Sequence, residues 1–252
     1  MAVQRINVLN VPVDVLRPED IEVEILSLLD KPGAKQIIFL SIWDLLFARA
    51  NTEYLVCLQK ADLVLPISKS ILFGARFLKQ DIPVRYNPFF SIISVLAVLN
   101  KHYKSLYLFG AHKPSLMQAE RNVRSTFENI QIVGRCVGYY DKMEEKNIIA
   151  AMFKASPAVV LLGSGIKNPE RWVYRRRNCF NSSIFIAHKD VLDIFSKRKK
   201  YVNPKTFEKG LEIWPAIIKN PLKLFLFFPF IWYCILLVWY RIFKLNRTKE
   251  NR

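Results

Sequence analysis

Short apolar runs alternate with amphipathic stretches along the chain. Residues 158–163 are apolar at almost every position, which is typical of a strand buried on both faces of a sheet. Such strands, alternating with helices, predict an α/β fold in which a mostly parallel sheet is covered by helices on both faces. We expect strands at residues 5–11, 36–40, 61–65, 105–110, 130–134, 158–163 and 183–187. We expect helices at residues 18–29, 43–60, 69–79, 87–101, 114–128, 142–155 and 168–178.

One apolar stretch near the C-terminus differs from the strands in length. Residues 224–240 are uncharged and almost wholly apolar, and basic residues flank them at both ends. A membrane-spanning helix usually needs about 20 apolar residues, with about 17 as the lower limit, and the Trp and Tyr residues of this segment favour the membrane interface. We predict that the segment associates with a membrane. A buried core helix is the alternative, and whether the segment spans a membrane or lies in one leaflet stays open.

The positive charge of the chain is concentrated in its C-terminal part. The 38 basic and 21 acidic side chains give a formal charge of +17, and residues 165–252 carry 19 basic and 6 acidic groups of these, or +13. This asymmetry indicates an anionic partner: nucleic acid, an acidic membrane surface or a phosphate-bearing substrate. The neighbouring apolar segment argues against nucleic acid, and no RNP-like or helix-turn-helix pattern supports it. We therefore divide the chain into a sheet domain, residues 1–200, and a helical, membrane-associating C-terminal appendage, residues 201–252.

Cysteine and histidine are too sparse to indicate a metal site or a disulfide framework. Three histidines and four widely separated cysteines form no cluster with metal-ligand spacing. We therefore predict neither a metal nor a cofactor. The first residues also lack the long apolar stretch of a signal peptide, so we expect the body of the protein to remain in the cytoplasm.

Glycine turns follow three of the expected strands. Gly110 and Gly134 end two of them, and Gly163-Ser164-Gly165 joins a third strand to a helix. Glycine allows backbone N–H groups to approach a phosphate, and the N-terminus of the helix adds partial positive charge. Lys167 lies beside this turn. We interpret the turn as a candidate cradle for a nucleotide diphosphate, with a purely connecting turn as the alternative.

Several ordered segments resemble one known family. Residues 161–172 (LLGSGIKNPERW) resemble the G-x-G-x-P-x-Q-E-x-W segment of the WecG/TagA/CpsF glycosyltransferases. Residues 61–66 (ADLVLP) look like the ADLVLP strand of that family. The resemblance extends from about residue 6 to about residue 223. It also includes Gly110 with Pro114, Ile132-Val133-Gly134 followed by Gly138-Tyr139-Tyr140, and Gly210-Leu211-Glu212 with Pro221.

The resemblance implies a modified Rossmann-like fold and a particular reaction. The family transfers N-acetylmannosamine or a related sugar from a UDP-sugar donor to a polyprenyl-diphosphate-linked sugar acceptor during synthesis of cell-envelope polysaccharides. This implies a location at the cytoplasmic face of the bacterial inner membrane, peripheral or single-pass, and leaves formation of a homo-oligomer open. The implied nucleotide-sugar-binding residues are Gly110, Gly134, Gly163, Gly165, Glu170 and Trp172. The basic residues expected to contact diphosphate or membrane are Lys167, Arg175, Arg176, Arg177, Lys219 and Lys223.

The residues at the reactive positions of the family differ in this chain. The Asp that follows ADLVLP, the family's proposed general base, corresponds to Ile67, whose side chain cannot accept a proton. The family's catalytic-pocket Gln corresponds to Pro169. His188, directly after the last expected strand, and Asp62 are candidate substitutes for the base. Two functions follow: an active glycosyltransferase with a different base, or an inactive member that binds nucleotide sugar or lipid diphosphate, or scaffolds envelope-biosynthesis enzymes at the membrane.

Overall fold

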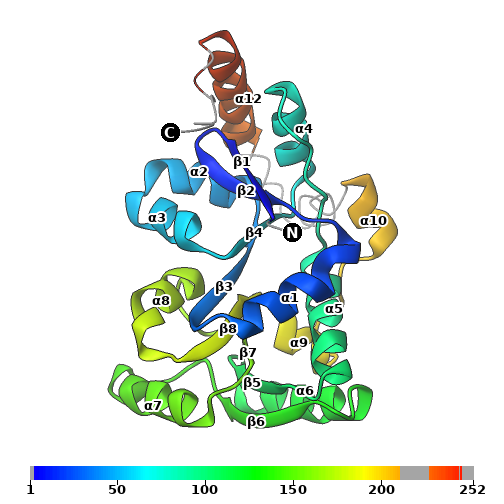
Figure 1. Ribbon diagram of the computed structural model, residues 1–252, viewed down its shortest axis with the longest axis vertical. Helices are drawn as coiled ribbons and strands as arrows, with labels where there is room; N and C mark the ends of the chain where they lie inside the picture. Colours follow the sequence, from blue (N-terminus) through cyan, green and yellow to red (C-terminus); the bar gives the residue numbers. More distant parts are fainter. Residues whose placement is uncertain (1–2, 211–226, 244, 246–252) are drawn as a thin grey trace. The chain divides into compact units, whose positions relative to one another are not determined.

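The computed structural model describes residues 3–210, 227–243 and 245 of the chain (Figure 1). The chain divides into two compact units. The first unit consists of Met1–Arg17, Phe39–Asn87 and Val202–Arg252, and the second consists of Pro18–Ile38 and Pro88–Tyr201. The predicted division after residue 200 stays a prediction. The expected contacts of Lys219 and Lys223, and the similarity to the family at residues 211, 212 and 221, lie outside the described residues.

A mostly parallel sheet is the central element of the fold, as predicted. In the described part of the chain, six strands form one sheet with the order β4-β3-β8-β7-β5-β6. The β3–β8, β8–β7, β7–β5 and β5–β6 pairs are parallel. The strands are β3 (Gly33–Leu40), β4 (Leu63–Pro66), β5 (Ser105–Phe109), β6 (Gln131–Cys136), β7 (Val159–Leu162) and β8 (Ser182–Ala187).

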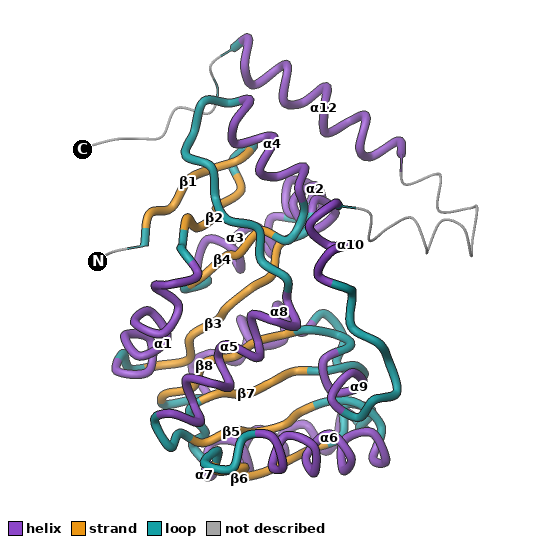
Figure 2. Tube along the Cα trace, turned by 90° about the vertical axis from the view of Figure 1, so that its right-hand side faces the viewer, coloured by secondary structure: helices purple, strands orange, loops and turns teal. Residues whose placement is uncertain are grey.

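Helices cover both faces of the sheet in the second unit. Figure 1 shows α7 and α8 on one side of the strands and α1, α5 and α6 on the other, and Figure 2 views the strands from the side on which α5 and α6 lie. Tyr107 and Phe109 of β5 belong to the apolar core that α7 and α8 cover. The alternate residues Leu106 and Leu108 are fully buried as well and point to the opposite face. The helices are α1 (Ile21–Asp30), α5 (Pro88–Lys101), α6 (Lys113–Thr126), α7 (Glu145–Ala155), α8 (Pro169–Arg176) and α9 (Val191–Phe195).

The first unit begins with an antiparallel hairpin of β1 (Gln4–Val8) and β2 (Val11–Val15). The prediction of a single strand at residues 5–11 is therefore wrong. Leu9 and Asn10 have positive φ angles of 51° and 67°, as a tight two-residue hairpin turn requires. The chain reverses at these two residues, although the apolar pattern continues through them.

The helix predicted at residues 43–60 is in fact two helices, α2 (Ile42–Ala50) and α3 (Thr52–Lys60). Asn51 between them has an extended backbone, and its side chain accepts a hydrogen bond of 2.8 Å from the Tyr54 N–H. It therefore caps α3, since a side-chain oxygen satisfies an N–H group that the helix leaves unpaired. The remaining described helices of the first unit are α4 (Lys69–Phe77), α10 (Pro204–Lys209) and α12 (Phe227–Ile242).

A partly buried ion pair holds the hairpin against β4. The guanidinium of Arg5 donates to both carboxylate oxygens of Asp14, at 2.7 and 2.8 Å. Asp14 also accepts a hydrogen bond of 2.6 Å from the Val64 N–H, and only 1% of the residue is exposed. The hydrogen bond to Asp14 raises the pKa of Arg5 above its ordinary value. The pair thus joins β1 and β2 to each other, and Asp14 joins them to β4.

The apolar C-terminal segment is described from Phe227 onward, as α12. Across the described ranges, we find no helix with the length and apolar character that would let it traverse a membrane. Membrane association of the segment stays a prediction.

Candidate functional site

Three loops meet at the carboxyl ends of β5, β6 and β7 in the second unit. The Gly110 N–H donates to the carbonyl of Cys136 at 2.9 Å, and the Ala111 N–H donates to the carbonyl of Ser164 at 2.7 Å. The Gly138 N–H in turn donates to the carbonyl of Ala111 at 3.0 Å. The glycine turns predicted after β5 and β7 are therefore neighbours at the edge of the sheet where parallel α/β folds bind their ligands.

Close packing of these loops explains their glycines. A Cβ atom on Gly110 would lie 2.6 Å from the backbone nitrogen of Gly163, and one on Gly138 would lie 2.1 Å from the carbonyl oxygen of Ser164. Gly165, with a φ of +96°, has the carbonyl carbon of Gly138 2.6 Å from its ideal Cβ position. No side chain fits at these positions without moving backbone. The glycines pack loop against loop, and their contact with a nucleotide stays a prediction.

Gly134, the remaining glycine predicted to bind the nucleotide sugar, lies in a strand and not in a loop. It lies inside β6, and the ring of Tyr107 on β5 occupies the space of a Cβ atom, at 2.3 Å from the ideal position. The glycine therefore accommodates the neighbouring tyrosine in the sheet.

An exposed aromatic pair lies beside the strand-end loops. The ring of His112, directly before α6, stacks on the ring of Tyr139 with centroids 4.0 Å apart and planes 4° apart. Both side chains are exposed, that of Tyr139 by 54%. Such a flat surface suits stacking with a planar ring, for example a nucleobase. The sequence placed each residue after a strand but gave no indication that the two rings touch.

His188, a predicted substitute for the base, follows β8. Its backbone N–H donates to the carbonyl of Leu162 at the end of β7, at 3.0 Å. Its ring Nδ1 is buried and has no hydrogen-bond partner among the described residues. Burial lowers the pKa of the imidazole below its ordinary 6.5, with the carboxylate of Asp190 acting in the opposite direction. This buried imidazole lies beside the end of β7, where burial favours its neutral form, and its action as a base stays a prediction.

Two carboxylates near these loops were missed by the sequence analysis. The Ser164 hydroxyl donates to Asp193 of α9 at 3.3 Å. Asp190 forms an ion pair of 2.5 Å with Lys199, and this contact raises the pKa of the lysine. Acidic residues at the start of a helix are common, because they favour the positive end of the helix dipole. This pattern alone therefore did not distinguish the two aspartates from ordinary helix-start residues.

Trp172 belongs to the apolar core of the second unit and is 6% exposed. Its ring lies against those of Phe109 and Phe180, with centroids 5.4 and 6.5 Å apart. Its indole N–H donates to Glu145 at 2.7 Å, and Arg176 donates to the same carboxylate at 2.6 Å. Burial raises the pKa of Glu145, but these hydrogen bonds outweigh it and hold the pKa below its ordinary 4.5. Trp172 and Arg176 thus fix α8 to α7 through Glu145. Their ligand contacts stay predictions.

The other predicted residues of this region lie at the two ends of α8. The carbonyl of Glu170, in the first turn, accepts a hydrogen bond of 3.0 Å from the side chain of Gln36. Lys167 is exposed just before the helix. Arg175 and Arg177 are exposed at its end, where the Arg177 guanidinium lies 5.1 Å from the centre of a tyrosine ring. Lys167 is therefore the cation nearest in sequence to the Gly163-Ser164-Gly165 turn.

Ile67, which the resemblance aligns with the proposed general base of the family, follows β4 in the first unit. Its N–H donates to the carbonyl of Leu40 at 2.9 Å, and its carbonyl accepts from Arg85 at 2.7 Å. The neighbouring hydroxyl of Ser68 accepts a hydrogen bond of 3.1 Å from the Ile42 N–H at the start of α2. The backbone is fixed on both sides, while the side chain at this position offers no proton acceptor.

Asp62, the second predicted substitute, precedes β4. A strand of 4 residues separates it from Ile67, and such a strand is about 13 Å long at about 3.3 Å per residue. The carbonyl of Asp62 accepts from Arg5 at 3.2 Å. Asp62 therefore lies at the opposite end of β4 from the position it was predicted to replace. Within the described residues, no three His, Cys, Asp or Glu side chains are grouped so that they could hold a metal ion.

The sequence is similar to known proteins over most of its length. The family model described as the glycosyl transferase WecG/TagA/CpsF family matches residues 6–250. The N-acetylglucosaminyldiphosphoundecaprenol N-acetyl-beta-D-mannosaminyltransferase of Bacillus subtilis (strain 168) is 24% identical over 172 residues, which are 68% of this chain and 66% of that protein. The protein of the same name from Staphylococcus aureus (strain NCTC 8325 / PS 47) is 21% identical over 163 residues, or 65% and 63% of the two chains. The chain thus spans slightly less than two thirds of the length of these relatives.

Proposed function

Because this chain belongs to the WecG/TagA/CpsF family of glycosyltransferases, we propose that it is a membrane-attached transferase for a sugar of the N-acetylmannosamine type. The donor is a UDP-sugar, and the acceptor is a polyprenyl-diphosphate-linked sugar used in cell-envelope polysaccharide synthesis. The relatives from Bacillus and Staphylococcus carry names that state such an acceptor and such a transferred sugar. The site of action is the cytoplasmic face of the plasma membrane.

The observation that carries the proposal is the family match over residues 6–250, which includes the strand-end loops of the second unit. In these loops, the turns after β5 and β7 are joined by the hydrogen bond from Ala111 to Ser164. A parallel sheet offers its ligand the carboxyl ends of its strands. In our proposal the donor nucleotide binds here, with its base on the exposed His112–Tyr139 pair and its diphosphate near Lys167.

The reaction needs a proton acceptor and charge stabilisation at the leaving group. The acceptor hydroxyl oxygen attacks the anomeric carbon of the donor, the bond from that carbon to the UDP oxygen breaks, and the electron pair leaves with UDP. Cations near the diphosphate stabilise the charge that develops there. The hydroxyl proton passes to a base, a function that Ile67 cannot perform. We assign this role to His188, whose ring Nδ1 has no hydrogen-bond partner among the described residues and whose pKa is lowered by burial.

A second function is favoured by one observation, the apolar side chain at position 67. Loss of a general base typically lowers a rate by about 100- to 10,000-fold. The alternative is therefore a family member that binds the nucleotide sugar or the lipid diphosphate without transferring the sugar.

UDP release tests these functions. The full-length protein is incubated with UDP-N-acetylmannosamine and a short-chain polyprenyl-diphosphate N-acetylglucosamine in detergent. Release of UDP that requires the acceptor supports the transferase. UDP binding by calorimetry without release supports the inactive binder. If the protein neither binds UDP nor releases it from the donor, both functions are overturned.

A further inference from the structure

A cluster of aromatic rings lies at the first turn of α5 in the second unit. The ring of Tyr201 stacks on the ring of Phe89, with centroids 5.5 Å apart and planes 7° apart. Phe90 meets Tyr201 edge to face, with centroids 5.5 Å apart and planes 79° apart. Phe195 of α9 also contacts Phe89, with centroids 5.4 Å apart. Because α9 directly follows β8, these contacts place the start of α5 at the carboxyl edge of the sheet.

The outer members of this cluster are exposed. Tyr201 is 51% exposed and Phe90 is 37% exposed, whereas Phe89 and Phe195 are partly buried. Phe89 covers one face of the Tyr201 ring, so the opposite face is the part of the ring that a ligand can reach. We call Phe90 and Tyr201 together the α5 aromatic surface.

A basic run directly precedes Tyr201 in the chain. Residues 197–200 are Lys-Arg-Lys-Lys, and all four are exposed. The carbonyl of Asp193 accepts hydrogen bonds from the N–H groups of Arg198 at 2.9 Å and Lys199 at 3.0 Å, which fold the run back against α9. Lys199 forms an ion pair, whereas the other three side chains have no carboxylate partner within the described residues. The run therefore offers cations to an anionic ligand.

This basic run connects the α5 aromatic surface to the strand-end loops. A hydrogen bond to Asp190 and, to a smaller extent, the phenol of Tyr139 raise the pKa of Lys199, so Lys199 lies near the His112–Tyr139 pair. Tyr201 follows Lys199 by two residues, which span at most about 7 Å. One edge of the second unit therefore carries two aromatic surfaces, with the basic run joining them.

The chemistry of the α5 aromatic surface fits a sugar that is joined to a diphosphate. One face of a sugar ring carries mainly C–H groups, and their partial positive charge favours the negative face of an aromatic ring. The phosphate oxygens are bound by lysine and arginine side chains. A purely apolar ligand would not need the basic run, and a free phosphate would not need the rings.

We propose that Phe90 and Tyr201 bind the sugar ring of the diphosphate-linked acceptor and that residues 197–200 bind its diphosphate. The inference rests on the proposed function, which names this acceptor. In that function the donor base lies on the His112–Tyr139 pair, so the two substrates occupy neighbouring surfaces of one sheet edge. The acceptor sugar thus approaches the donor from the side of α5 and α9.

Calorimetry with two matched ligands tests the sugar contact. The full-length protein is titrated in detergent with a short-chain polyprenyl diphosphate and with the same diphosphate carrying N-acetylglucosamine. We expect the sugar-bearing ligand to bind about 10-fold more tightly. Phe90→Ala and Tyr201→Ala should each remove most of this difference, because the stacking surface is lost. Equal affinities of the unaltered protein for the two ligands overturn the proposal.

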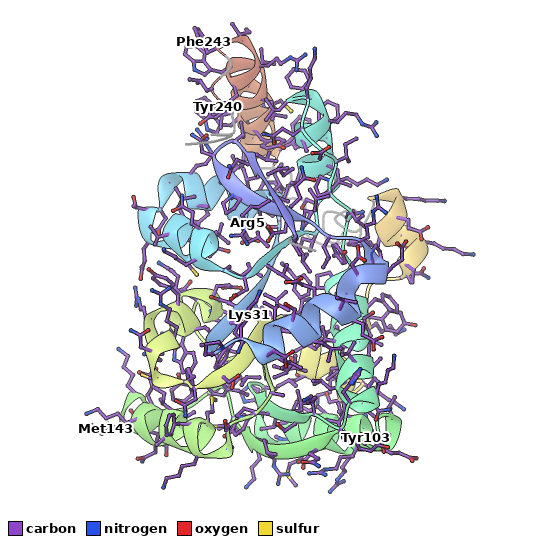
Figure 3. All side chains as sticks on the ribbon, in the orientation of Figure 1. Arg5, Lys31, Tyr103, Met143, Tyr240 and Phe243 are labelled. Atoms are coloured by element: carbon purple, nitrogen blue, oxygen red, sulfur yellow. The ribbon has the colours of Figure 1, made fainter. Side chains whose placement is uncertain are left out.

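Tyr103→Ala is the matched control for these variants. Tyr103 is a 66% exposed tyrosine just beyond the C-terminal end of α5 (Figure 3), so the control removes an exposed ring at the opposite end of the same helix. This variant should bind both ligands like the unaltered protein. A loss as large as that in Tyr201→Ala would show that the effect is not local to the α5 aromatic surface and would overturn the proposal.

Arg198→Glu and Lys200→Glu test the basic run. Each should weaken the sugar-free and the sugar-bearing ligand by the same factor, about 10-fold, since the lost contact is to the diphosphate. Lys154→Glu, at an exposed lysine of α7, is the control and should leave both affinities unchanged. Normal binding of both ligands by Arg198→Glu and Lys200→Glu would overturn the assignment of the diphosphate to this run.

Folding of the aromatic variants is checked by circular dichroism, which must match that of the unaltered protein. Phe90→Leu and Tyr201→Leu serve as second variants if it does not. Leucine keeps an apolar side chain in the cluster but lacks the flat ring, so these variants should lose the preference for the sugar-bearing ligand as well. A preference that persists in both leucine variants overturns the proposal.

UDP affinity separates this proposal from the proposed function. Phe90→Ala and Tyr201→Ala should bind UDP like the unaltered protein, and a loss of UDP affinity would assign the surface to the donor and overturn the proposal. Preferential binding of the sugar-bearing ligand without UDP release would contradict the transferase and support the acceptor site. UDP release with an unchanged KM for the acceptor in both variants would support the transferase and overturn the acceptor site.

Discussion

The hydroxyl of Tyr233 donates a hydrogen bond of 2.8 Å to the carbonyl oxygen of Ser70, 163 positions earlier in the chain. The contact is possible because Gly74, one turn further along α4, has no side chain. A Cβ atom there would lie 2.1 Å from the Tyr233 oxygen and 3.2 Å from Leu237. The close approach of α4 and α12 thus depends on one glycine in the middle of a helix, where glycine is otherwise unfavourable.

Gly74→Ala should destabilise the first unit by about 1–3 kcal/mol, although alanine is the better helix former. The physical reason is the clash with the Tyr233 hydroxyl, which must move with α12. Urea unfolding measures the loss, and Tyr233→Phe provides the control. That substitution removes the clashing oxygen and one hydrogen bond worth about 1 kcal/mol, so the double variant should be more stable than the two single losses added together. Strict additivity would show that the clash is not the cause.

Asp14→Ala should cost about 3–5 kcal/mol of unfolding free energy. It leaves the Arg5 guanidinium without its partner in a partly buried site and removes the acceptor of the Val64 N–H. The matched control is Asp81→Ala, at an exposed aspartate of the same unit, which should change the stability by less than about 0.5 kcal/mol. Equal effects of the two substitutions in thermal or urea unfolding would contradict the structural role of the Arg5–Asp14 pair.

If the protein is the inactive binder and its donor and acceptor sites are intact, Ile67→Asp should raise the rate of UDP release by up to about 100- to 10,000-fold, the usual contribution of a general base. The main-chain hydrogen bonds of Ile67 to Leu40 and Arg85 do not involve its side chain. The fold should therefore accept the change. Ile82→Asp is the control, because it makes the same exchange at an exposed isoleucine of the same unit. A rate that stays unchanged in Ile67→Asp would show that the base is not what the reaction lacks.

Because His188 is buried, the protein should lose stability in mildly acidic solution, where the His188 ring takes up a proton on unfolding. Burial lowers its folded-state pKa below 6.5, so the folded protein binds fewer protons than the unfolded chain. The unfolding free energy therefore decreases as the pH falls from about 6.5 through the lower folded-state pKa. Replacement by glutamine should make the urea midpoint less dependent on pH between about 7.5 and 5.5.

The comparison variant for this experiment is His112→Gln. His112 is an exposed histidine of the same unit. A His188→Gln protein with the same pH dependence as the unaltered chain would show that protonation of His188 does not limit stability in this range. The carboxylate of Asp190 and the ammonium of Lys199 also act on the His188 ring, so the ionic strength must be held constant.

The sequence predicted which residues of the candidate site follow the strands, but it did not predict which side chains touch one another. Gly110, Gly163 and His188 all follow strands of a parallel sheet, and parallel strands end at a common edge, so their proximity follows from the pattern. The stacking of His112 on Tyr139 and the hydrogen bond from Trp172 to Glu145 do not follow from it. Each joins two side chains whose positions depend on loop conformation and on the packing of α7 against α8.

The sequence by itself determined the parallel sheet, most helix positions and the family, because buried strands and amphipathic helices impose periodic patterns on neighbouring residues. Only the tertiary structure decided where the pattern breaks. Leu9 and Asn10 turn the chain into a hairpin, and Asn51 ends one helix and caps the next. It also decided which side of α12 is held by Tyr233 and Tyr240 and which side is exposed. In an all-apolar helix no periodic pattern distinguishes the two sides, so the choice depends on partners that are distant in the sequence.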